Sequence, residues 1–196
     1  QPMATLIPKL KFNEPRHNLP GRKGIATLED RFTINFARTY LEQRHAIHAG
    51  SNRTEMTVAR EFPVHGYGIA DLVAVAWNPT IPSDSSLEDF VSSGMVTSRA
   101  FECKISDWRA ALTQGGRYRY FAHQAIVVLP EKSCCLALSF LDTFQAIKVG
   151  LWSFDMVSRK ITIHHTPRPI APKSKKYFGH SMKLTQKAAK GALPFL

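Results

Sequence analysis

Three side chains that could hold a cation or act on a phosphate ester lie in two apolar runs of the sequence. The run from residue 100 to 104 reads Ala-Phe-Glu-Cys-Lys, and the run Ile69 to Trp77 carries Asp71 as its only charged residue. Side chains alternate between the two faces of an extended strand, so Glu102 and Lys104 share one face. An acid on each of two strands of the buried type suggests a metal site.

Carboxylate oxygens are the ligands that Mg²⁺ and Mn²⁺ prefer. Hydrolysis of a phosphodiester needs an activated water, an electrophile at the phosphate and relief of the developing charge. We therefore expect Asp71 and Glu102 to hold the metal, and Lys104 to orient the attacking water or offset charge at the phosphate. The simpler interpretation of Glu102 and Lys104 is a surface ion pair, worth less than about 1 kcal/mol.

A helix is expected from Gly24 to about Arg44, with Thr27 as its N-cap. The apolar residues at helical spacing are Ile25, Phe32, Phe36 and Tyr40. Glu29 falls close to the middle of this apolar stripe. An unpaired buried carboxylate is costly, so Glu29 either caps the first turn or faces the same site as Asp71 and Glu102.

A second helix is expected directly after the lysine, from a cap at Ser106 to about Ala122. Its expected inner face consists of Trp108, Leu112, Gly115 and Tyr118 or Arg119. Gly115 and Gly116 each cost about 1 kcal/mol relative to Ala in a helix interior, which indicates a kink or a close approach of the backbone to another segment. The hydrogen-bond donors along this helix are Arg109, Gln114, Arg117 and Arg119.

The remaining apolar patterns predict further strands near residues 56–64, 124–129, 148–155 and 161–164, and another helix near 132–143. Three cysteines, an odd count with two of them adjacent, fit neither a disulfide framework nor a zinc site. We predict that Cys103, Cys134 and Cys135 are reduced and buried. The pair His164 and His165 is predicted to be exposed at a strand edge.

The chain has 196 residues, with 26 basic and 15 acidic side chains and a formal net charge of +11. That length predicts one domain, residues 24–165, between a basic arm at 1–23 and a basic tail at 166–196. The positive charge favours a nucleic acid as partner, although a ribosome-associated protein or a binder of anionic membranes would have a similar balance. Without a run long enough to span a membrane, and with prolines and lysines near the beginning, the sequence predicts a cytoplasmic location.

These features together resemble the PD-(D/E)xK nuclease superfamily over roughly Gly24 to His164. The resemblance rests on Asp71, on the run Phe-Glu-Cys-Lys-Ile-Ser-Asp-Trp-Arg, and on the later runs Gly-Arg-Tyr-Arg-Tyr-Phe-Ala, Ile-Val-Val-Leu-Pro and Val-Gly-Leu-Trp-Ser-Phe-Asp. Its small bacterial branch of putative DNA-repair endonucleases looks most similar. The sequence departs from the family pattern in having Ala70 where the motif names a proline, and in a longer stretch between the two acids.

The resemblance implies an α/β fold with a restriction-endonuclease-like core, in which helices flank a central mixed sheet of about five strands. It implies a Mg²⁺- or Mn²⁺-dependent deoxyribonuclease acting in repair, recombination or a mobile-element context. The Cys103 carbonyl would be a further metal ligand, and Glu29 matches a first-helix glutamate of some branches. Gln114 and Tyr118 would line the site or touch the backbone of the nucleic acid. The expected nucleic-acid contacts are Arg109, Arg117, Tyr118, Arg119, Lys173, Lys175 and Lys176.

Two other functions remain open from the sequence. The first is a catalytically inactive, nuclease-like module that binds DNA or a protein partner, and the second is an RNA-directed or ribosome-associated protein. The two acids favour the enzyme, because carboxylates repel phosphate unless a cation lies between them. The sequence also leaves open whether the protein acts alone, as a homodimer or in a larger DNA-processing complex.

Overall fold

A mixed β-sheet forms the centre of the protein. The computed structural model describes residues 27–47, 55–64, 68–77 and 96–189, together with Ser86 and Asp89. The strands of the sheet are β1 (Glu55–Val64), β2 (Gly68–Trp77), β3 (Val96–Cys103), β4 (Gln124–Leu129), β5 (Val149–Asp155) and β6 (Lys160–His165). They lie in the order β1-β2-β3-β4-β5-β6. The pairs β3/β4 and β4/β5 are parallel and the other three pairs are antiparallel.

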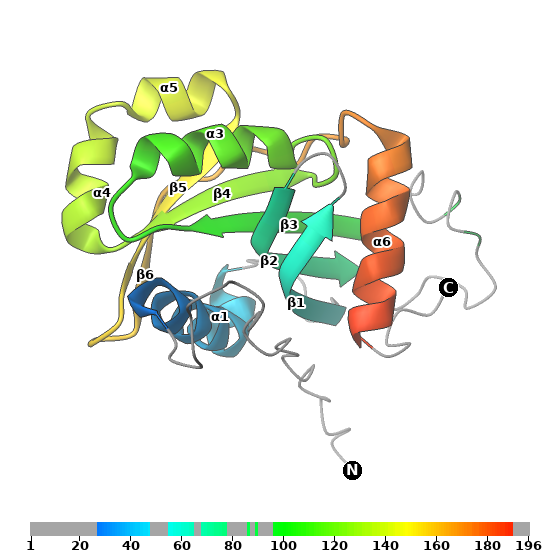
Figure 1. Cartoon of the computed structure of the whole chain (residues 1–196), viewed down its shortest axis with the longest axis horizontal. Coiled ribbons are helices and arrows are strands. Elements are labelled where there is room, and N and C mark those ends of the chain that lie inside the picture. The colour runs from blue at the N-terminus through cyan, green and yellow to red at the C-terminus, as the bar shows by residue number, and fades with distance from the viewer. Residues whose placement is uncertain are drawn as a thin grey trace, which may run out of the picture.

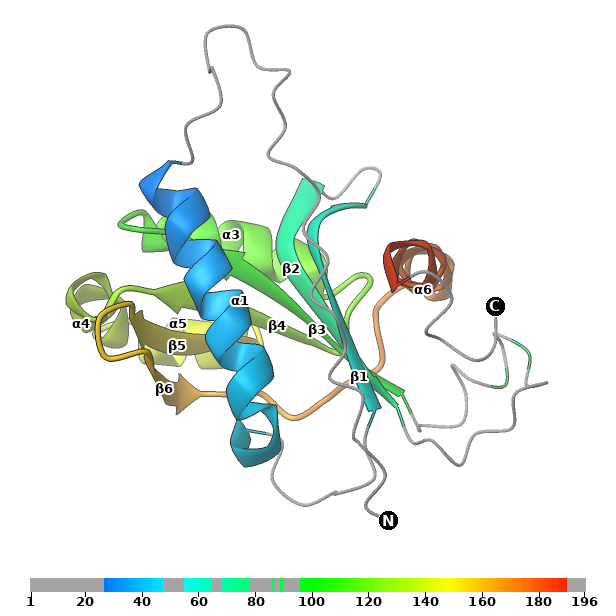
Figure 2. The same ribbon diagram turned by 90° about the horizontal axis from the view of Figure 1, so that it is seen from below.

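Helices cover both faces of this sheet (Figures 1 and 2). The helices are α1 (Leu28–Ile47), α3 (Trp108–Tyr118), α4 (Glu131–Leu138), α5 (Leu141–Ala146) and α6 (Lys175–Ala189). The helix α1 crosses one face, whereas α3, α4 and α5 lie over the other, and α6 stands near β1. The predicted α/β class with a mixed central sheet is confirmed, with six strands in place of about five.

The first helix begins where the sequence predicts. Thr27 and Asp30 cap it reciprocally, because the Asp30 amide donates to Thr27 Oγ1 at 3.1 Å and the Thr27 amide donates to Asp30 Oδ2 at 2.8 Å. The predicted stripe residues Phe32, Phe36 and Tyr40 are buried. Their rings contact the aromatic rings of Phe101, Trp152 and Phe154 from the sheet. This aromatic layer fixes α1 against the sheet, and Ile25 lies outside the described residues.

The helix after the lysine differs from the prediction at both ends. Asp107, and not Ser106, caps α3, because its Oδ1 accepts from the Ala110 amide at 3.0 Å. The helix ends at Tyr118 and does not reach Ala122. A Cβ atom on Gly115 would lie 3.2 Å from a methyl group of Val149 and 3.4 Å from one of Val127. This glycine therefore allows the helix to approach the sheet closely, which was one of the two interpretations that the sequence left open.

The strands β2 and β3 are covered on both faces, as their apolar runs predict. Val73, Val75 and Trp77 lie in the core beneath α3, so Asp71 is in phase with that face, whereas Phe101 and Cys103 belong to the core beneath α1. The predicted alternation of faces on β3 is thereby confirmed.

Two expectations outside the site need correction. The predicted helix near 132–143 is two short helices, because the chain turns at Ser139 and Phe140 between α4 and α5. Cys103 and Cys134 are buried, but Cys135 is exposed, since α4 turns that side chain away from the sheet.

The predicted basic arm at residues 1–23 lies outside the described residues. In the part of the chain that the structure describes, no helix combines the length and the apolar character needed to cross a membrane.

Part of the segment predicted as a basic tail, residues 166–196, packs against the core, and residues 190–196 lie outside the described residues. Phe178 and Met182 on α6 are buried in the same cluster as α3. The segment before α6 is held by backbone hydrogen bonds, from the Ile170 amide to the His123 carbonyl at 3.2 Å and from the Lys173 amide to the Arg119 carbonyl at 3.0 Å. The domain therefore extends beyond residue 165 to include α6.

Removing the side chain of Phe178 tests this extension. The substitution Phe178→Ala should lower the free energy of unfolding by about 3 to 5 kcal/mol, because it leaves a cavity in a closed core. Urea denaturation measures the change. The matched control on the exposed side of α6 is Lys175→Ala, expected to stay within about 0.5 kcal/mol of wild type. Equal stabilities of the two variants would show that α6 is not part of the folded domain.

Candidate active site

The two predicted acids meet at the end of the sheet where β3 finishes. The last pair in the β2/β3 register is Leu72 with Phe101, so Asp71 and Cys103 come just beyond the regular ladder. There the Cys103 amide donates a hydrogen bond to Asp71 Oδ2 at 2.8 Å. The Asp71 carboxylate thus takes the place of a backbone carbonyl of β2 as the hydrogen-bond acceptor for the Cys103 amide. This bond fixes the Asp71 side chain against the end of β3.

Glu102 is buried next to Asp71 on the α3 side of the sheet. Its side chain is 1% exposed, and its Oε2 accepts a hydrogen bond from the Tyr118 hydroxyl. Burial and then the nearby charge of Asp71 raise the pKa of Glu102 to about 8, against smaller opposing effects of Tyr118 and Lys104. The charge of Asp71 is thus close enough to disfavour ionisation of Glu102, in addition to the larger effect of burial.

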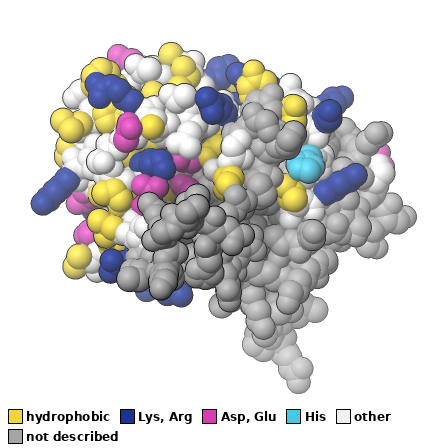
Figure 3. Space-filling model, viewed as in Figure 1, with side chains coloured by type: hydrophobic (Ala, Val, Ile, Leu, Met, Phe, Trp, Pro, Cys, Tyr) yellow, Lys and Arg dark blue, Asp and Glu magenta, His cyan; other side chains and the backbone are white. Residues whose placement is uncertain are grey.

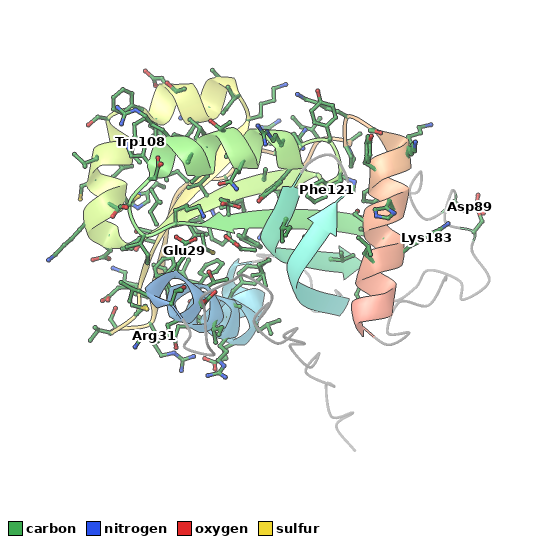
Figure 4. All side chains as sticks on the ribbon, in the orientation of Figure 1. Glu29, Arg31, Asp89, Trp108, Phe121 and Lys183 are labelled. Carbon is green, nitrogen blue, oxygen red and sulfur yellow. The ribbon has the colours of Figure 1, made fainter. Side chains whose placement is uncertain are left out.

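Lys104 joins this pair to α1. Its Nζ lies 2.8 Å from Glu29 Oε1 and 3.5 Å from Glu102 Oε1, and Glu29 points from α1 toward this end of the sheet (Figure 4). Desolvation would lower the pKa of Lys104, but the hydrogen bond to Glu29 and the charges of Glu102, Glu29 and Asp71 together raise it above its usual range. Lys104 is therefore an ammonium ion at neutral pH.

Of the two roles left open for Glu29, the structure places this side chain at the site. The capping role belongs to its neighbour Asp30. Glu29 is 41% exposed and Lys104 is 24% exposed, so their contact opens to solvent while Glu102 is enclosed. One side of the site is thus accessible to a ligand.

Tyr118 makes two contacts at the site that the sequence did not specify. It is 1% exposed, and its hydroxyl lies within hydrogen-bond distance of Glu102 Oε2 and, at 2.9 Å, of the Ile69 carbonyl. Burial and the negative charge of Glu102 raise the pKa of Tyr118 above its usual range. The hydroxyl links the beginning of β2 to the end of β3, and so holds the strands that carry the acids. An inner-face tyrosine needs a polar partner, which was the only sequence signal for this contact.

The Cys103 carbonyl is expected to face β2, the strand that carries Asp71. The Lys104 amide bonds to the Val128 carbonyl of β4 at 3.1 Å. Successive residues of a strand bond to opposite sides, and the N–H and C=O of one residue point to the same side. Since the Cys103 amide points to Asp71, its carbonyl faces β2 as well.

The donor set fits a magnesium-type ion better than a transition metal. No group of three or more His, Cys, Asp or Glu side chains suited to a metal occurs among the described residues. Mg²⁺, however, is commonly held by one or two carboxylates, with waters and substrate phosphates completing its shell. Asp71, Glu102 and the Cys103 carbonyl are oxygen ligands of that kind, and a cation between the acids would offset the repulsion that raises the Glu102 pKa.

The other predicted site residues fall into two groups. Gln114 is half-buried one helical turn before Tyr118, and Arg109 and Arg117 are exposed on α3. Arg109 packs over the Trp108 ring, with its guanidinium carbon 4.4 Å from the ring centroid. The structure therefore places these three residues on the helix beside the acids, without a hydrogen bond from Gln114 to either acid among the described residues.

Tyr118 and Arg119 do not occupy the surface position expected of nucleic-acid contacts. Arg119 is 4% exposed, and its Nη1 donates to the carbonyls of Ala122 at 2.8 Å and His123 at 2.6 Å. Both side chains turn inward because α3 ends at this point and the following loop closes over them. By contrast, Lys173, Lys175 and Lys176 are exposed.

Comparison with known proteins adds no relative. The chain matches no family model, and no curated protein or solved structure matches it.

The buried carboxyl of Glu102 should make stability depend on pH in metal-free buffer. Its pKa is about 8 in the folded state against an ordinary value of 4.5, so between these values the native state holds a proton that the unfolded chain has lost. The free energy of unfolding should therefore fall by up to about 1.4 kcal/mol for each pH unit toward pH 8. The half-buried His123, with its pKa lowered to about 4, has the opposite effect on stability, but only below its ordinary pKa of 6.5.

Urea denaturation at several pH values between 6.5 and 8, with EDTA present, measures this slope. Glu102→Gln should flatten it, because the amide does not titrate. The exposed Glu42, which pairs with Arg159 at 2.6 Å, supplies the matched control Glu42→Gln, expected to keep the wild-type slope. The assignment fails if Glu102→Gln and wild type lose stability in parallel.

Proposed function

We propose that this protein is a metal-dependent nuclease that hydrolyses phosphodiester bonds in DNA, and that its sheet is a restriction-endonuclease-like core. The observation that supports this most is the buried Glu102 carboxyl beside Asp71, with the Lys104 ammonium 3.5 Å from Glu102. Two acids and one lysine at the end of neighbouring strands are the groups that a metal-assisted phosphodiester hydrolysis uses.

A purely structural ion pair accounts for this arrangement less well. One ammonium ion could satisfy Glu102, but Lys104 lies closer to Glu29 than to Glu102. Asp71 adds a second negative charge that raises the Glu102 pKa further. Burying a carboxyl next to another acid is unfavourable unless a cation is present during function. The excess of acid at the site is therefore the expected state of a metal site before the metal binds.

Each residue has a defined task in the proposed reaction. Asp71, Glu102 and the Cys103 carbonyl would hold Mg²⁺ or Mn²⁺, which when bound polarises the phosphate and lowers the pKa of a water molecule. Lys104 cannot serve as a general base because it remains protonated. Its ammonium instead donates hydrogen bonds that orient the water or offset charge on the phosphate. Glu29 keeps that ammonium at the open side of the site.

Cleavage assays with Mg²⁺ or Mn²⁺ on plasmid, linear, single-stranded and branched DNA test the proposal. We expect wild-type protein to cut at least one of these substrates, and Glu102→Gln and Lys104→Ala to lower the rate by about 100-fold or more, because each removes charge that acts on the phosphate or its metal. The exposed side chains of α4 provide matched controls, Glu131→Gln and Lys132→Ala, which should cut at the wild-type rate.

Two results would overturn this assignment. If Glu102→Gln and Lys104→Ala cut as fast as wild type, the nuclease site lies elsewhere. If wild-type protein binds DNA but cuts none of the substrates with either metal, the protein is a binding module with a nuclease-like site.

The Tyr118 hydroxyl should contribute to metal affinity without touching the metal. Tyr118→Phe keeps the ring in the core but removes the bond that holds Glu102, so we expect Mn²⁺ to bind about 10-fold more weakly. Titration calorimetry at pH 8.5 measures this, because the Glu102 proton competes less with the metal there. Tyr120→Phe is the matched control, with its ring retained under Lys173. Unchanged Mn²⁺ affinity with a lower melting temperature would leave Tyr118 only a structural role.

A further inference from the structure

The positive charge of the chain is concentrated in its last fifth. Nine of the 26 Lys and Arg residues follow Asp155, and none of the 15 acidic residues does. This fifth therefore carries nine of the eleven net positive charges, while the rest of the chain is nearly balanced. A charge asymmetry of this size indicates a polyanion as partner.

Much of this charge lies on a helix that is already folded and docked. On α6, Phe178, Ser181 and Met182 face the core, and Ser181 Oγ donates to the Phe178 carbonyl at 2.8 Å within the helix. The opposite side carries exposed Lys175, Lys176, His180 and Lys183. Lys176, His180 and Lys183 have the spacing i, i+4, i+7, which aligns them along one face. Figure 3 shows basic side chains gathered over this part of the molecule.

These lysines are not engaged in ion pairs within the described residues. The three ion pairs there are Lys104 with Glu29, Lys104 with Glu102, and Arg159 with Glu42. No acidic residue occurs in α6 itself. Among the described residues, the basic face of α6 therefore has no acidic partner, and Figure 4 shows the position of Lys183 on this helix.

The segment that leads into α6 lies beside the end of α3, whose Tyr118 contacts Glu102. Tyr118, which contacts Glu102, is preceded by the exposed Arg117 and followed closely by Tyr120. Lys173 Nζ lies 5.1 Å from the centroid of the Tyr120 ring, and the Lys173 amide bonds to the Arg119 carbonyl. The end of α3 and the beginning of α6 are thus side by side, so one extended anion could contact both.

We propose that the exposed face of α6 binds the sugar–phosphate backbone of duplex DNA whose scissile phosphate lies at Asp71 and Glu102. The identity of the polyanion rests on the proposed function. An anionic membrane fits less well, because an interfacial helix inserts its apolar face into the bilayer, and the apolar face of α6 is used against the core. The basic face has lysines at fixed spacing, which suits contacts with phosphates and carries no sequence preference.

The test neutralises α6 and compares it with an equal charge change elsewhere. The α6 variant carries Lys175→Gln, Lys176→Gln and Lys183→Gln. The matched control carries Lys132→Gln, Lys148→Gln and Lys160→Gln. These are exposed positions on or near α4, α5 and β6, on the side of the sheet away from β1 and α6. Both variants lose three positive charges. A difference in DNA affinity between them is therefore due to the position of the lysines and not to the net charge. Circular dichroism confirms that both remain folded.

The affinity is measured by fluorescence anisotropy of a labelled DNA duplex of about 30 base pairs. The buffer contains Ca²⁺ or EDTA, so that binding is measured without cleavage. The salt concentration is raised from about 50 to 200 mM. The α6 variant should bind at least about 10-fold more weakly, and its slope of log K against log salt should be shallower by roughly 2 to 3, since each lost phosphate contact removes about 0.9. The control variant should keep the wild-type slope.

Equal weakening in both variants, or no weakening in either, overturns the proposal. Vesicles containing phosphatidylserine form a second arm, and loss of vesicle binding with unchanged duplex binding would make α6 a membrane contact and also overturn it. These outcomes distinguish failure of this inference from failure of the proposed nuclease activity. If the protein binds duplex DNA through α6 but does not cut it, DNA binding by α6 is supported and the nuclease activity is not. If wild-type protein cuts DNA and the α6 variant binds DNA normally, the nuclease activity is supported and DNA binding by α6 is not.

Discussion

The burial of the Glu102 carboxyl beside Asp71 is the constraint on which the rest of the site depends. A buried acid next to a second acid is unfavourable, and contacts with the Tyr118 hydroxyl and the Lys104 ammonium reduce this cost. With its pKa raised to about 8, Glu102 also avoids the repulsion at neutral pH by remaining protonated. The two acids can be ionised together only against that repulsion. The fold thus holds two carboxyl groups together in a way that a divalent cation would relieve.

The site forms at an end of the sheet where groups from both covering layers meet. Glu29 reaches it from α1 on one face, and Tyr118 reaches it from α3 on the other. Lys104 follows the last residue of β3, so it can extend around the end of the sheet toward both. Because α1 and α3 are held by separate cores, a change in either helix should alter the position of the shared lysine or of Glu102.

Charge is divided between two regions. The acids lie at the end of β3, whereas nine basic residues and no acidic ones follow Asp155, and four of these nine belong to α6, which packs beside β1. If basic side chains surrounded the acids directly, they would neutralise them and compete with a metal. Under the proposed function, this separation would allow the acids to hold a cation while the lysines on α6 attract phosphate over a longer range.

Local pattern and periodicity were enough to predict the strands, the helix cap at Thr27, the inner face of α3 and the shared face of Glu102 and Lys104, because these depend on neighbours close in sequence. They could not predict that Glu29 bonds to Lys104, 75 residues away, or that Tyr118 joins Glu102 to the Ile69 carbonyl. Nor could they show that the basic tail is a docked helix. Those features depend on which elements pack together, and burial, which sets the Glu102 pKa, exists only once the chain has folded.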